Sequence, residues 1–183
     1  MAVTRIPLLS IPIDILPDED IEKTVLELLT KQTPQPIVFL TLWDLLKARR
    51  HAEFRAMLEN AALCLPLSKS LLWAARFLKY PVPIRRDSFD MIIRILDVIS
   101  AHYKSLYLLG GRTHSLLDAE RNVRSTFPGA GIVGRFNGFY RKSMEADIIL
   151  SIAKAHPALV IIGNGIHGEA LWIYRNREKL PGS

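Results

Sequence analysis

Three glycine-bearing segments are the places in this sequence where backbone amides could do chemistry. Gly110-Gly111 follow the apolar run Leu106 to Leu109, Gly163-Asn164-Gly165 follow Val160 to Ile162, and Gly134 to Tyr140 form a third loop. A glycine at a strand-to-helix turn lets amides approach a phosphate, and the dipole of the next helix favours the anion. Each segment alone is more often a tight turn, and none is a dinucleotide fingerprint or a Walker loop. Together they indicate a nucleotide or sugar-phosphate ligand.

Side chains that could act as nucleophiles, bases or metal ligands are sparse. No two histidines have the spacing of a shared metal site on one helical turn, so no protein-bound metal is expected; they are His51, His102, His114, His156 and His167. Only His167, just after the Gly163-Asn164-Gly165 turn, lies where a reacting group could be reached, and the alternative is a solvent-facing loop residue. Cys64, within the apolar run Ala61 to Leu65, is interpreted as a buried core residue.

Short apolar runs predict the strands that must position these segments. They are Ile37 to Leu42, Ala62 to Pro66, Ser105 to Gly110, Gly131 to Gly134 and Ala158 to Gly163. None alternates polar with apolar residues, which predicts that both faces are covered. Since helical patterns separate the runs, we expect one α/β, Rossmann-like domain over residues 1–183, with a mainly parallel sheet and helices on both faces. The segment Ile6 to Leu16, which contains prolines, is expected to be an edge strand or hairpin.

Helical periodicity fills the intervals between the strands. The expected helices are a stripe of Ile21, Val25, Leu28 and Leu29, then Trp43 to Asn60 with room for one break, Ser70 to Leu78, Asp87 to Tyr103, His114 to Thr126, Ser143 to Ala155, and Gly168 to Lys179. Asp87 or Ser88 would cap the fourth helix, and Pro128 and Pro157 would stop the fifth and sixth. Ligands of such sheets bind at the carboxyl ends of the strands, so the three glycine segments are expected on one rim.

Positive charge is concentrated in one part of the chain. The 183 residues carry 24 Lys and Arg against 18 Asp and Glu, a formal net charge of +6. Residues 44–86 alone hold nine basic and three acidic side chains. Two interpretations stay open: a solvated helical face, or a surface for phosphates or an anionic membrane. With no zinc-finger spacing, aromatic platform or basic tail, nucleic acid is not an expected partner.

The amino terminus does not have the pattern of a targeting segment. Met1 to Leu16 is interrupted by Arg5, Pro7, Pro12 and Asp14, and no stretch reaches the roughly 18 consecutive apolar residues of a membrane span. A cytoplasmic protein is therefore the expectation, and a single cysteine agrees with a reducing compartment.

The order of several short motifs is more specific than any one of them. They are Leu108-Leu109-Gly110-Gly111, Phe127-Pro128-Gly129, Ile132-Val133-Gly134, Asn137-Gly138-Phe139-Tyr140, Gly163-Asn164-Gly165 and Trp172. In this order and spacing the sequence resembles the WecG/TagA/CpsF family of bacterial glycosyltransferases. The resemblance begins near Ile11-Pro12-Ile13-Asp14 and reaches the last helix.

The resemblance implies a metal-independent, inverting enzyme that works beside the inner membrane. It would move a sugar from a UDP donor to a polyprenyl-pyrophosphate-linked acceptor in surface-polysaccharide synthesis. The donor would be bound by Gly110, Gly111, Gly138, Phe139, Gly163, Asn164, Gly165 and Glu169. Thr41, Arg85 and Asp90 match a family Thr, a family Arg placed for phosphate and the Asp that follows it.

The sequence also departs from the family pattern. Pro66 matches a family Pro-Asp-Gly turn, but the Asp thought to be the base is Leu67 here, which leaves Asp90 and His167 as base candidates. The Pro, Gln and Glu of the last glycine turn are replaced as well. Loss of a positioned base removes on the order of 100- to 10,000-fold in rate. The alternative is therefore a non-catalytic relative that binds a nucleotide or a partner protein.

Length is a further departure. Family members usually continue for several tens of residues beyond the helix that contains Trp172, into a basic segment that helps reach the membrane, whereas this sequence stops at Ser183. Apolar surface exposed where that segment would pack favours self-association into a homo-oligomer.

Overall fold

The computed structural model describes residues 3–31, 33–166, 168 and 170–180. The chain forms two compact units, each described by itself below. The first comprises Met1–Leu28 and Gln35–Ile95, and the second comprises Leu29–Pro34 and Leu96–Ser183. The expectation of one domain over the whole chain stays a prediction.

The first unit opens with a two-stranded antiparallel hairpin, which confirms the expectation for this segment. Strand β1 (Thr4–Leu8) pairs with β2 (Ile11–Ile15), and Leu8 lies opposite Ile11. The two turn residues, Leu9 and Ser10, both have positive φ angles, of 50° and 67°. Such a turn matches the right-handed twist of the strands. Its usual Asn-Gly signature is missing, so the sequence alone did not reveal this turn.

A buried carboxylate ties the hairpin to the next sheet. Asp14, 1% exposed, accepts hydrogen bonds from Arg5 Nε at 2.7 Å and Nη2 at 2.9 Å, and from the Cys64 amide at 2.7 Å. Arg5 Nη2 also donates to the Ala62 carbonyl at 2.8 Å. These bonds satisfy the buried charge. Cys64 itself is buried, as predicted, and burial raises the pKa of its thiol to about 12.

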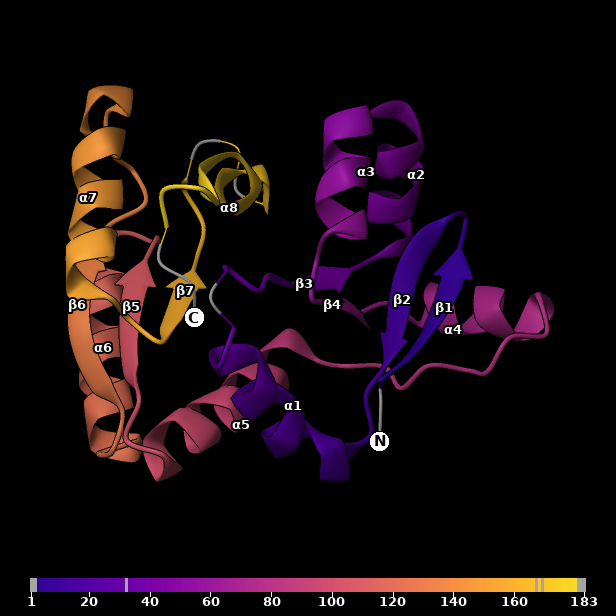
Figure 1. Cartoon of the computed structure of the whole chain (residues 1–183), viewed down its shortest axis with the longest axis horizontal. Coiled ribbons are helices and arrows are strands. Elements are labelled where there is room, and N and C mark those ends of the chain that lie inside the picture. Colours follow the sequence, from indigo (N-terminus) through magenta and orange to yellow (C-terminus); the bar gives the residue numbers. More distant parts are fainter. Residues whose placement is uncertain (1–2, 32, 167, 169, 181–183) are drawn as a thin grey trace. The chain divides into compact units, whose positions relative to one another are not determined.

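The remaining strands of the first unit form a parallel pair. Strand β3 (Ile37–Leu40) lies beside β4 (Leu63–Pro66), with Leu40 opposite Pro66. Helices α2 (Leu42–Arg50) and α3 (Ala52–Glu59) connect them and stand side by side (Figure 1). The one break expected in this helical stretch occurs at His51, whose backbone is extended. Helix α4 (Lys69–Phe77) follows β4.

One further helix precedes this pair of strands in the sequence, and another follows it. The 3-10 turn η1 (Asp18–Asp20) leads into α1 (Ile21–Leu29), and α5 (Ser88–Ala101) begins after an Asp87 cap. The Asp87 carboxylate accepts hydrogen bonds from the amides of Phe89 and Asp90 at 3.0 and 3.3 Å. Asp87, rather than Ser88, is therefore the cap.

The second unit is a three-stranded parallel sheet in the order β6-β5-β7, namely β6 (Gly131–Phe136), β5 (Ser105–Leu109) and β7 (Leu159–Ile162). Helix α6 (Thr113–Thr126) connects β5 to β6, and the 3-10 turn η2 (Lys142–Met144) with α7 (Glu145–Ala155) connects β6 to β7 (Figure 1). Helix α8 (Ala170–Asn176) comes last. The predicted parallel strands are thus confirmed, and they are divided between two sheets.

Helices cover both faces of the β6-β5-β7 sheet. Tyr107 and Leu109 of β5 share a buried cluster with Ile148 and Ile152 of α7 and Trp172 of α8. The intervening Leu108 points to the other face, because successive strand residues alternate, and lines a pocket together with residues of α6. Coverage is not uniform, since residues along the edge strand β6 alternate between exposed and half-buried.

Among the described residues, no helix combines the length and apolar character needed to span a bilayer.

Candidate functional site

The three glycine segments meet at one rim of the β6-β5-β7 sheet. The Gly111 amide donates to the Asn164 carbonyl at 2.7 Å, and the Gly138 amide donates to the Gly111 carbonyl at 2.9 Å. The segments follow β5, β6 and β7, so parallel pairing brings their carboxyl ends to the same edge. The prediction of a common rim is therefore confirmed.

This convergence depends on the absence of side chains at the corners. A Cβ on Gly110 would lie 2.7 Å from the backbone of Gly163, and one on Gly138 would lie 2.3 Å from the Asn164 carbonyl oxygen. A Cβ on Gly165 would lie 2.8 Å from the ring of Phe139. Backbone cannot yield at such distances at Gly110 and Gly138, and at Gly165 the φ of 93° is one that other residues rarely adopt.

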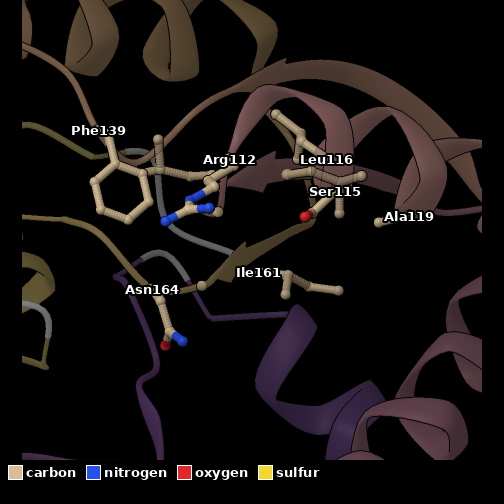
Figure 2. A pocket seen from close by; sticks show the side chains of 12 residues that line it. Arg112, Ser115, Leu116, Ala119, Phe139, Ile161 and Asn164 are labelled. Carbon is tan, nitrogen blue, oxygen red and sulfur yellow. The ribbon is translucent and has the colours of Figure 1, made fainter.

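A pocket of about 430 Å³ lies at this rim, and all its lining residues belong to the second unit. They are Leu108, Leu109, Gly110, Gly111, Arg112, Ser115, Leu116, Ala119, Phe139, Ile161, Gly163 and Asn164. Figure 2 shows Arg112 and Phe139 at one end of the pocket and Ser115, Leu116 and Ala119 at the other. The pocket therefore combines a polar end with an apolar wall.

The amino end of α6 supplies the positive character of the pocket. Arg112 occupies the cap position, and its carbonyl accepts the first helical hydrogen bond, from the Leu116 amide at 2.9 Å. The amides of residues 113–115 consequently have no partner inside the helix. The first turn of α6 contains no acidic residue, and no other described residue forms an ion pair or hydrogen bond with the Arg112 guanidinium. An anion would find both amide and guanidinium donors here.

Sequence reasoning identified the glycines, Phe139 and Asn164 but missed Arg112 and Ser115. The signal was present, because both residues directly follow Gly110-Gly111 and open the helix that starts there. A basic residue at the cap position of a helix that follows two glycines would have indicated an anion site. Phe139 projects at this rim with 64% of its surface exposed.

Tyr140 anchors the loop that carries Gly138 and Phe139. Its ring packs edge-on against Phe136, with ring centroids 6.1 Å apart. Burial raises the pKa of the Tyr140 phenol, and the nearby negative charge of Glu145 raises it further. The phenol is therefore protonated at neutral pH and holds the loop rather than serving as a base.

Three of the predicted catalytic residues, Thr41, Arg85 and Asp90, lie in the first unit. Thr41 caps α2, and both its amide and its hydroxyl donate to Asp44 Oδ2, at 2.8 and 2.7 Å. Arg85 is exposed, and its Nε donates to the Leu67 carbonyl at 2.9 Å. Because Thr41 follows β3 and Leu67 follows β4, the structure brings Thr41, Leu67 and Arg85 to the carboxyl rim of the β3-β4 pair.

The third predicted catalytic residue of the first unit is Asp90. Asp90 lies in the first turn of α5, where Arg94 Nε donates to its Oδ2 at 3.0 Å. His167 and Glu169 lie outside the described residues. Within the described part of the chain, no three His, Cys, Asp or Glu side chains gather as metal ligands would.

Gly138→Ala tests whether close backbone contact holds the corners together. We expect it to lower the free energy of unfolding by about 2 kcal/mol or more, because the added carbon collides with the Asn164 carbonyl. Gly131→Ala, at the start of the strand that leads to this loop, is the matched control, since its Cβ would meet nothing closer than 3.9 Å. That control should change stability by less than about 1 kcal/mol. Equal stabilities of the two variants in chemical denaturation would contradict the geometry.

The whole-chain comparison agrees with the motifs and the geometry of the rim. A family model described as the Glycosyl transferase WecG/TagA/CpsF family matches residues 6–183, nearly the full length. A search among curated proteins found no match to this sequence. The match covers most of the hairpin, both parallel sheets and the three glycine corners. This chain belongs to the WecG/TagA/CpsF family of glycosyltransferases.

Proposed function

We propose that this protein transfers a sugar from a UDP-sugar to a polyprenyl-pyrophosphate-linked acceptor in surface-polysaccharide synthesis, on the cytoplasmic side of the membrane. The observation that carries the proposal is the convergence of three glycine corners on the amino end of α6, beside Arg112. Membership of the glycosyltransferase family supports the reaction class.

The diphosphate is the part of the donor that this pocket suits best. When the sugar leaves, negative charge develops on the departing diphosphate, and donors already in place stabilise it without reorganisation. The free amides of α6 and the Arg112 guanidinium are such donors. They supply the positive groups, so the proposal includes no metal ion.

The rest of the pocket suits a nucleoside. Its wall contains Leu108, Leu116 and Ile161, and the exposed ring of Phe139 stands at its edge. A volume of about 430 Å³ falls in the usual range for small-molecule sites. The uracil ring of UDP would stack against Phe139, and the diphosphate would bind Arg112. The ligand would then contact both the apolar and the polar parts of the pocket.

Transfer also needs a base that takes the proton of the acceptor hydroxyl. Leu67 cannot accept a proton, and Asp90 and His167 are the candidates that carry a titratable group. Arg85 would hold phosphate, as the resemblance implies. Its guanidinium retains free donors, because only the Nε–Leu67 bond engages it among the described residues.

A non-catalytic, nucleotide- or partner-binding relative is the second candidate. The observation that favours it is Leu67 at the position of the family base, on the same rim as Thr41 and Arg85. In that case the glycine pocket would bind UDP without turnover.

Arg112→Ala tests the donor site. We expect it to weaken UDP binding about tenfold or more in calorimetric titration, because charge-assisted hydrogen bonds contribute about 1.5–3 kcal/mol. Arg121→Ala is the matched control, since Arg121 lies on the same helix, outside the pocket, and pairs with Asp118. Equal affinities of the two variants, or no binding of UDP at millimolar concentration, would overturn the donor site.

Arg85→Ala tests catalysis separately from binding. With a UDP-sugar and a lipid-linked acceptor, we expect turnover to fall by about 100-fold or more, because the family resemblance places this guanidinium at a phosphate. Arg55→Ala, at a surface ion pair of α3, should keep full activity. UDP binding by the unmodified protein with no turnover of any donor would instead favour the non-catalytic relative.

A further inference from the structure

Exposed apolar side chains are crowded into one short stretch of the first unit. Seven of the fifteen large exposed hydrophobic residues of the described chain lie between residues 73 and 89. We call them the α4 strip: Trp73, Phe77, Leu78, Tyr80, Val82, Ile84 and Phe89. Trp73, Phe77 and Phe89 are 77%, 86% and 71% exposed. Single exposed apolar residues are ordinary, but a concentration of this kind marks an interaction surface.

The geometry of α4 explains why its aromatic residues face outward. Leu71 and Ala75 are fully buried, so they define the inner face of the helix. Trp73 and Phe77 each follow one of these by two positions, which is about 200° around a helix. They are also four positions apart, so they lie together on the outer face. The helix is therefore apolar on both faces, and only the inner one is used by the fold.

Along the α4 strip the charges have one sign as far as Arg86, and Asp87 and Asp90 flank its last residue, Phe89. From Asn60 to Arg86 the sequence contains no Asp or Glu and five Lys or Arg. Of these, Arg86 is buried and pairs with Asp18 at 2.5 Å. Lys69, Arg76 and Lys79 are exposed, and no other described residue forms an ion pair with them. The strip is thus bordered by cations with free charge.

We propose that the α4 strip binds the surface of an anionic phospholipid membrane, with Trp73 and Phe77 in the interfacial layer and Lys69, Arg76 and Lys79 at the lipid phosphates. Tryptophan is enriched at that depth, and basic residues gain about 1 kcal/mol each from anionic lipid. The outer face of α4 therefore has the character of an interfacial helix, with apolar side chains bordered by basic ones.

Charge argues against a second copy of the chain as the occupant. A symmetric dimer through this strip would bring identical surfaces together. Each would present the same unpaired cations, and the two acids that flank Phe89 are already engaged, since Asp87 caps α5 and Asp90 accepts a hydrogen bond from Arg94. Anionic lipid has the complementary sign. The inference concerns the first unit alone and does not depend on nucleotide binding or catalysis.

Fluorescence of Trp73 tests the inference directly. The chain has three tryptophans, and Trp172 is 1% exposed, so Trp43→Phe leaves Trp73 as the exposed reporter. Vesicles of phosphatidylcholine with phosphatidylglycerol should shift its emission to the blue and protect it from acrylamide. Vesicles of phosphatidylcholine alone should do so far less. Vesicle binding without these two changes would overturn the proposal, because the α4 strip would then lie away from the lipid.

Sedimentation with the same vesicles measures the contribution of the side chains. Trp73→Ser with Phe77→Ser should lower partitioning about tenfold or more, and Arg76→Gln with Lys79→Gln about fivefold per cation removed. Tyr103→Ser with Leu150→Ser removes exposed apolar residues of the second unit, 85% and 52% exposed, and should leave partitioning unchanged. Equal losses in the two apolar pairs would contradict a role for the strip. A second result would also contradict it: no binding to the vesicles, together with self-association of the protein that Trp73→Ser and Phe77→Ser abolish. That result would assign the strip to a protein interface.

Discussion

The second unit is organised around a place where three stretches of backbone touch. Gly110, Gly138 and the Gly163 to Gly165 turn approach so closely that a single methyl group would separate them. Because they are in contact, the strands β5, β6 and β7 end at a common level, and α6 starts with its free amides facing the pocket. The site is therefore made mainly of backbone, and its chemistry depends on the fold more than on reactive side chains.

The first unit presents a different kind of rim. Thr41 and Leu67 stand at the ends of β3 and β4, with Arg85 bonded to the Leu67 carbonyl. The Thr41 hydroxyl is already used in capping α2. This rim has a cation free to meet phosphate but an aliphatic residue where the family resemblance places a carboxylate. The side chains at this rim therefore suit phosphate binding, and in the proposed reaction the acceptor proton would pass to Asp90 or His167.

Much of the fold could be predicted from local patterns. The apolar runs marked all five parallel strands to within a few residues, Asp87 marked the start of α5, and the prolines 128 and 157 marked helix ends. The common rim followed because parallel strands end together. The division of the strands between two sheets could not be predicted, since periodicity shows that a strand is buried but not which strand lies beside it. The Leu9-Ser10 turn was missed because its residues do not favour positive φ.

The sequence predicted the glycines of the candidate site but not its side chains Arg112 and Ser115. Glycines attract attention because their positions constrain the backbone, whereas Arg112 and Ser115 look like ordinary helix-start residues until the pocket is seen. Thr41 illustrates the opposite case. A family match suggested chemistry, and the structure shows a capping residue whose polar groups are occupied.

Amide chemical shifts during a titration with UDP test the central claim most directly, because they report which backbone groups meet the ligand. The account predicts that the largest changes fall on Gly110, Gly111, Gly138 and the amides of residues 113–115, at the free amino end of α6. Another pocket lies at the end of α2, where Lys47, Arg49 and Arg50 line it, and changes concentrated there instead would show that charge alone attracts the nucleotide. That result would contradict a diphosphate site built from the glycine corners.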